Sequence, residues 1–241
     1  AHTVHAEEDQ EEVARTFERY NLVSAAVVDE SERLVGVLTI DDIVDVIHEE
    51  HEEDFKRMAG VGDEEISDNV FNAVRSRFIW LMVNLGTAVM ASVIIGLFDA
   101  TIQQMVALAI LMPIVASMGG NAATQTMTVA VRAIAQRNLG PVNALRVVAR
   151  ESTVGVLNGV AFAVIMGLFA WWWFGSDQLG LVIGAAMIIN MFAAALAGIL
   201  IPLALDHFEI DPAISSGVFV TTVTDVVGFF AFLGLAAWWL L

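Results

Sequence analysis

Residues 178–205 read QLGLVIGAAMIINMFAAALAGILIPLAL and contain no charged side chain, with Asp177 and Asp206 at the two ends. A helix of about 18 or more apolar residues is long enough to cross the hydrocarbon core of a membrane. This stretch therefore predicts a membrane-spanning helix.

Four more stretches of this kind follow the same rule. They cover residues 78–98, 100–131, 152–176 and 212–241, the last interrupted only by Asp225. A large soluble protein with buried helices is the alternative, but connections of a few residues leave it little room. The pattern predicts an all-α polytopic membrane domain with five transmembrane helices over residues 78–241.

The second of these stretches is too long for a simple span. Its 32 residues would extend about 48 Å as a straight helix, against a hydrocarbon core of about 30 Å. It must tilt, break or extend past the membrane, and we expect a break at Pro113 or at Gly119 and Gly120.

Charge is concentrated in the first third of the chain. Residues 1–77 carry 21 of the 28 acidic side chains and 7 of the 11 basic ones, so we do not expect nucleic acid as a partner. The chain has no cysteine, which excludes disulfides and thiolate metal sites. No nucleophile with a base and no phosphate-cradling loop is recognisable, so we do not expect an enzyme.

The basic residues predict the orientation. Beyond Arg77 they all lie between the second and third spans, at Arg132, Arg137, Arg146 and Arg150. The positive-inside bias then places the N-terminus in the cytoplasm and the C-terminus outside the plasma membrane. Tryptophans at 171–173 and 238–239 would lie at the outer interface.

Residues 1–54 predict a small cytoplasmic α/β segment, joined to the membrane domain by a connecting helix over 55–77. A helix ends near Tyr20, two short strands follow at 25–28 and 34–38, and a second helix begins at Asp41. The sequence GVLTIDD at 36–42 resembles the end of a CBS repeat, with one repeat of the usual pair present. The resemblance implies that Thr39 and Asp42 hold the ribose of an adenine nucleotide, but a helix cap at Thr39 or Asp41 is the favoured alternative.

An acidic run precedes the first span. Residues 49–54 read EEHEED, and four more acids follow in 63–68. Clusters of oxygen ligands suit hard cations such as Mg²⁺ and Ca²⁺, whereas a solvated helix face is the structural alternative. His48, His51 and Glu52 have the helical spacing of a transition-metal site, but no third strong ligand is in view.

Asp225 is the sharpest functional signal, because it lies about 18 Å into the last span. A carboxylate at this depth costs several kcal/mol unless it is paired, hydrated or protonated. No Lys or Arg lies at comparable depth, so a mobile cation or proton is its natural partner. Thr221 shares its helix face, and Asp211 lies within about 40° of it.

A polar stripe in the second span completes the candidate site. Asn121, Thr124, Gln125 and Thr128 recur at helical spacing on an otherwise apolar helix. Such a stripe avoids lipid and faces water or other helices. Hydrogen bonding between helices is the structural alternative.

These two regions carry a resemblance to a known family. Residues 113–125, PIVASMGGNAATQ, and the pattern Asp211-Pro-Ala followed by Thr221, Thr222 and Asp225 closely resemble the signatures of MgtE-type magnesium channels. The resemblance covers the membrane domain, the second CBS repeat and the connecting helix. Ala123 and Val218 depart from the family's usual Gly and Pro.

The resemblance implies a homodimer in the lipid bilayer with a Mg²⁺-selective pore on its two-fold axis. Asp225 and Thr221 would hold the ion, which could also be Mn²⁺, Co²⁺ or Ca²⁺. The implied pore lining comprises Gly119, Gly120, Asn121, Thr124, Gln125 and Thr222. The implied sensing residues, which would bind Mg²⁺ and favour the closed pore, are Asp211, Glu49, Glu52, Glu53 and Asp54.

Two other functions stay open. A secondary exchanger would couple a divalent cation to H⁺ or Na⁺, with Asp225 as a protonating relay. A membrane anchor for a nucleotide-sensing segment would carry out no transport, and its function would not depend on Asp225.

Overall fold

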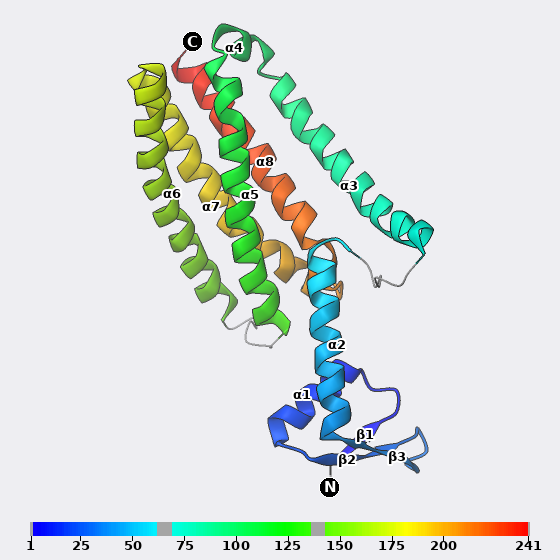
Figure 1. The fold of residues 1–241 in the computed structure, drawn as a ribbon. Helices are drawn as coiled ribbons and strands as arrows, with labels where there is room; N and C mark the ends of the chain where they lie inside the picture. Colours follow the sequence, from blue (N-terminus) through cyan, green and yellow to red (C-terminus); the bar gives the residue numbers. More distant parts are fainter. Residues whose placement is uncertain (1, 62–68, 136–142, 241) are drawn as a thin grey trace. The chain divides into compact units, whose positions relative to one another are not determined.

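The computed structural model describes residues 2–61, 69–135 and 143–240. These residues form two compact units, Ala1–Arg57 and Met58–Leu241, which are described separately (Figure 1). The boundaries predicted from the sequence, with a connecting helix at 55–77, stay predictions, because part of that helix lies outside the described residues.

The first unit is a three-stranded sheet covered by helices. Its elements are β1 (Thr3–His5), α1 (Gln10–Tyr20), β2 (Ser24–Val28), β3 (Leu34–Thr39) and α2 (Ile40–Met58). β2 lies in the middle, parallel to β1 and antiparallel to β3. Phe17 of α1 and Ile43 of α2 are each 1% exposed and form the core with Val4, Val13 and Ala25. The predicted helix–strand–strand–helix order is confirmed, whereas β1 was not predicted.

The second unit consists of helices only, within the described residues. They are α3 (Val70–Gly96), α4 (Asp99–Gln104), α5 (Ala107–Ala135), α6 (Ala144–Phe174), α7 (Asp177–His207) and α8 (Pro212–Trp239). All except α4 are long and apolar enough to cross a membrane, which confirms the five predicted spans. Successive long helices run in opposite directions, so α3 begins and α8 ends at opposite ends of the bundle (Figure 1).

The helix predicted for the second charge-free stretch, residues 100–131, does break, but not at the predicted residues. Met105 and Val106 separate α4 from α5, and α5 continues through Pro113, Gly119 and Gly120. Pro113 lies inside α5, where a proline lacks one backbone N–H donor, yet the helix continues past it. The glycine at 119 serves close packing instead, since a Cβ there would lie 2.2 Å from Nδ2 of Asn190.

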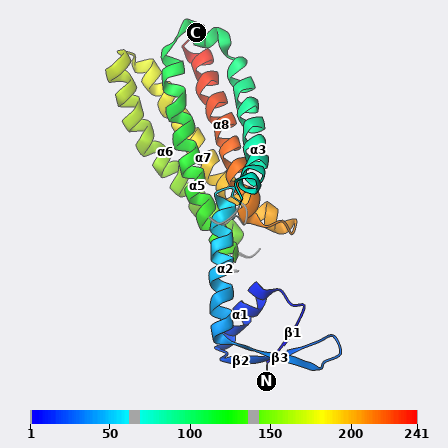
Figure 2. The same cartoon turned by 45° about the vertical axis from the view of Figure 1, so that its right-hand side comes forward.

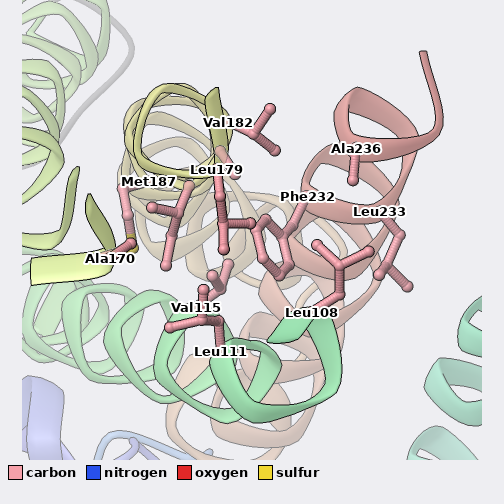
Figure 3. Packing of buried hydrophobic residues seen from close by; sticks show 12 residues of the cluster. Leu108, Leu111, Val115, Ala170, Leu179, Val182, Met187, Phe232, Leu233 and Ala236 are labelled. Atoms are coloured by element: carbon pink, nitrogen blue, oxygen red, sulfur yellow. The ribbon is translucent and has the colours of Figure 1, made fainter. Parts of the chain in front are cut away.

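α7 is the central helix, packed against α5, α6 and α8. Glycines allow its close approach to α6: a Cβ on Gly180 would lie 2.6 Å from the carbonyl oxygen of Gly167. Figure 3 shows the main apolar cluster, in which Phe232 of α8 lies among Leu108 and Leu111 of α5 and Leu179 of α7. α3 packs on α8 and is mostly exposed (Figure 2).

The two ends of the bundle differ in composition. Arg132 ends α5, Arg146 and Arg150 begin α6, and Arg75 lies at the start of α3, all at one end. The exposed tryptophans at the ends of α6 and α8 lie at the other end of the bundle. There Gly175 caps the end of α6, and its φ of 68° allows the turn into α7. Arg137 lies outside the described residues.

Candidate cation pathway

Asp225 lies halfway along α8 and is half-buried in the single chain. Within the described residues, no hydrogen bond or ion pair engages its carboxylate. One turn earlier, the Thr221 hydroxyl donates to the backbone oxygen of Gly217 at 3.0 Å. Its lone pairs therefore stay free to accept a hydrogen bond or to contact a cation.

The polar stripe of α5, defined as Asn121, Thr124, Gln125 and Thr128, is exposed along its whole length. The two threonine hydroxyls donate to the backbone oxygens of Gly120 and Thr124, both at 2.9 Å. The two amides have no such local partner in the described residues. Contact between these polar side chains and lipid tails would be unfavourable in free energy, because hydrocarbon offers the amides no hydrogen-bond partner.

α5 and α8 meet beside the stripe. A Cβ on Gly120 would lie 3.8 Å from Cγ2 of Thr221, so the residue before Asn121 lies close to the helix face of Asp225. The structure thus brings together the helices that carry the two predicted motifs. Gly119 and Thr222, also predicted to line the pore, are buried, and the Thr222 hydroxyl donates to Val218 at 2.6 Å.

Asp211 caps α8. Its carboxylate accepts a hydrogen bond from the backbone N–H of Ala213 at 2.8 Å. A negative charge at this position also favours the helix dipole. The residue therefore has a local structural role that does not depend on any metal.

The acidic run lies on the last turns of α2, where ion pairs within the helix engage part of it. Glu52 pairs with Lys56 at 2.9 Å, and Glu53 pairs with Arg57. In the described residues no three His, Asp or Glu side chains gather to hold a metal, which gives the transition-metal alternative at His48 no support. Glu49 is exposed, Asp54 is partly exposed, and residues 63–68 lie outside the description.

Thr39 and Asp42 form a cap at the start of α2. The backbone N–H and the hydroxyl of Thr39 both donate to Oδ2 of Asp42, at 2.9 and 2.6 Å. The side-chain hydrogen bond, followed by the backbone one, lowers the pKa of Asp42 below its ordinary value. This geometry matches the capping alternative.

Asn190 of α7 is a buried polar residue that the sequence reasoning missed. It is 1% exposed, and its Nδ2 donates to the backbone oxygen of Val115 in α5 at 2.8 Å. The signal was available, since it is the only amide between Gln178 and Leu205. Glu151 of α6, 7% exposed and paired with Arg150 at 2.8 Å, was missed as well.

Comparisons with known proteins agree with these two units. A family model described as "Divalent cation transporter", MgtE, matches residues 112–235, and a CBS domain model matches residues 1–49. These matches cover most of α5, all of α6 and α7, most of α8 and most of the first unit.

Curated relatives match nearly the whole chain. Proteins named "Magnesium transporter MgtE" from Bacillus subtilis (strain 168) and Enterococcus faecalis (strain ATCC 700802 / V583) are each 33% identical, over 95% and 98% of this chain. One from Thermus thermophilus is 33% identical over 97%. The chain spans about half the length of these relatives, 51% to 52%. The chain therefore belongs to the MgtE family of divalent cation transporters, which are transport proteins and not enzymes.

Proposed function

We propose that this chain forms a Mg²⁺-selective channel, with a pore on the two-fold axis of a homodimer and lined by α5 and α8. The observation that carries the proposal is the polar stripe of α5. All four of its side chains are exposed in the single chain, although the helix is apolar enough to span a membrane.

The stripe needs an environment other than lipid. Asn121 and Gln125 each present an amide with two donors and an acceptor oxygen, which hydrocarbon cannot satisfy. Water in a pore, or a second copy of the chain across an axis, satisfies them. The threonine hydroxyls already donate to the backbone, so their oxygens offer lone pairs to a hydrated cation.

Asp225 gives the pore its charge. One chain supplies a single carboxylate, whereas a two-fold axis beside α8 would supply two. Mg²⁺ keeps several of its waters and is commonly bound by one or two carboxylates, so two Asp225 side chains suit a hydrated ion. The curated relatives are named as magnesium transporters, which favours Mg²⁺ over Mn²⁺, Co²⁺ or Ca²⁺ as the principal cargo.

Closure by intracellular Mg²⁺ is the second part of the proposal. Mg²⁺ bound by Asp211 and by the acidic run, Glu49, Glu52, Glu53 and Asp54, would favour the closed pore. The run's ion pairs with Lys56 and Arg57 join residues four apart on one helix, and they are partly exposed to solvent. Pairs of this kind contribute little to stability, so a divalent cation can compete with them. Sensing requires the N-terminus to lie in the cytoplasm and the C-terminus outside the plasma membrane.

An adenine nucleotide is not part of the proposed activity. The Thr39 hydroxyl already donates to Asp42, so a ribose would have to replace this bond. A hollow in the same unit is lined by His5, Ala6, Glu7, Asp29, Glu30 and Ser31. The carboxylates of Glu7, Asp29 and Glu30 in this lining would repel the phosphate groups of a nucleotide.

The test is Mg²⁺ flux into proteoliposomes by Asp225→Asn, which keeps the side chain's size and removes its charge. Asp99→Asn, at an exposed position at the start of α4, is the matched control. We expect Asp225→Asn to lose flux and Asp99→Asn to keep it. Undiminished flux in well-folded Asp225→Asn would refute the assignment of the pore.

Planar bilayers separate the channel from the exchanger. A channel gives single-channel currents that follow the Mg²⁺ gradient and the voltage. An exchanger gives none, and its Mg²⁺ uptake depends on a gradient of H⁺ or Na⁺. A membrane anchor shows neither activity.

A further inference from the structure

Asn190 lies where three helices of the membrane bundle meet. Its side chain projects from α7 into a gap that two glycines leave open, Gly119 of α5 and Gly228 of α8. A Cβ on Gly119 would lie 2.2 Å from Nδ2 of Asn190, and a Cβ on Gly228 would lie 2.7 Å from the same atom. Both distances are too short for any real contact, so the amide occupies the place of two missing methyl groups.

One hydrogen bond fixes the orientation of the amide. Nδ2 donates to the backbone oxygen of Val115 at 2.8 Å, one turn before Gly119 on α5. Oδ1 is buried and accepts no hydrogen bond within the described residues. An unsatisfied buried acceptor destabilises a fold, and an apolar side chain could fill this space without that penalty. The presence of an amide at this position therefore favours a role beyond packing.

The position of the junction suggests that role. Asn121 is the first residue of the polar stripe, and Gly119 lies two residues before it on α5. Gly228 lies one helical turn beyond Asp225 on α8. Asn190 thus packs against α5 and α8, the two helices that carry candidate pore residues, at one glycine of each. The hydrogen bond ties α5 to α7, and the fit against Gly228 limits how closely α8 approaches.

We propose that Asn190 is a positioning residue that sets the spacing and rotation of α5 and α8 around the pore, and thereby the discrimination between Mg²⁺ and Mn²⁺. It touches no ion and acts through the two helices. The inference rests on the proposed channel function. A hydrated ion is recognised by how far apart the surrounding oxygens are held, so a change in helix spacing alters selectivity as well as rate.

The experiment measures Mg²⁺ and Mn²⁺ flux in proteoliposomes for wild type, Asn190→Ala, Gly119→Ala and the double variant Gly119→Ala/Asn190→Ala. Asn143→Ala is the control, because this exposed residue precedes α6 and its side chain makes no capping hydrogen bond. The readouts are the half-saturating Mg²⁺ concentration and the Mg²⁺ to Mn²⁺ flux ratio, each at equal amounts of monodisperse protein.

We expect Asn190→Ala to change the flux ratio at least threefold, with Asn143→Ala unchanged. Gly119→Ala should lose at least tenfold in Mg²⁺ flux because its methyl group meets the amide. The double variant should regain part of that flux, since the clash is gone, but keep the altered ratio, since the hydrogen bond is gone. This pattern distinguishes positioning from a merely structural role.

Three outcomes overturn the proposal. One is an Asn190→Ala protein whose half-saturating Mg²⁺ concentration and Mg²⁺ to Mn²⁺ flux ratio both equal those of wild type. Another is a double variant as inactive as Gly119→Ala. The third is a double variant that does not assemble, because Asn190 would then be needed for the fold rather than for the geometry of the pore. If wild type itself carries no channel flux, the proposed function fails instead, so the two failures are distinguishable.

Discussion

Substitution of Gly155 by alanine tests the packing of α6 against α7. A Cβ at this position would lie 2.7 Å from Cβ of Ala195 and 2.8 Å from the backbone oxygen of Met191. The second contact is with the backbone of α7 and cannot be relieved by a rotamer change. The helices must separate, and overpacking of this kind costs about 1–3 kcal/mol. The folded-to-unfolded ratio should therefore fall by about 5- to 150-fold.

Gly86→Ala is the matched control, because nothing lies within 4 Å of the Cβ that it adds to α3. Alanine is the better helix former by about 1 kcal/mol in water, so this variant should be as stable as wild type or more stable. Denaturant unfolding in mixed micelles is measured by the fluorescence of the tryptophans, three of which end α6. Equal stability of the two variants would refute the packing argument.

Two predictions concern the carboxylates with known hydrogen bonds. Asp42 should titrate below its ordinary pKa of 3.8, and Thr39→Val should raise that pKa by removing the hydroxyl donor, as measured by NMR with carbon-13 aspartate; no rise would contradict the cap. A lowered pKa stabilises the fold above the unfolded value, and this contribution is lost as the pH falls through the lower folded value. Asp211→Asn keeps an oxygen for the Ala213 N–H, so its stability should match wild type, whereas Asp211→Ala should lose about 0.5–2 kcal/mol. If Asp211 also senses Mg²⁺, both variants should need a higher Mg²⁺ concentration to close the pore, as measured by inhibition of Mg²⁺ flux. Inhibition of Asp211→Asn at the wild-type Mg²⁺ concentration would contradict a sensing role for Asp211.

The five spans could be predicted because the thickness of the bilayer imposes a length on each apolar stretch. The exposed stripe of α5 could be predicted as well, since Asn121, Thr124 and Gln125 share a helix face whatever packs behind them. A local pattern was sufficient in both cases.

Features that depend on distant partners could not be predicted in this way. The break at Met105 has no proline or glycine to mark it, while Gly119 turned out to accommodate Asn190, which lies 71 residues further along the chain. β1 has only three residues and owes its pairing to β2, more than twenty residues later. The face that Thr222 presents likewise depends on the neighbours of α8.

The most direct test of the pore is Mg²⁺ flux through Gln125→Cys in proteoliposomes, before and after a water-soluble thiol reagent. The chain has no cysteine of its own, so the label is unique. Leu168→Cys, on the exposed apolar surface of α6, is the control. The polar stripe of α5 predicts that the reagent modifies Gln125→Cys and blocks its flux, while Leu168→Cys keeps its flux. A Gln125→Cys protein that is modified and still conducts at the wild-type rate, or that never reacts, would contradict a pore lined by this stripe.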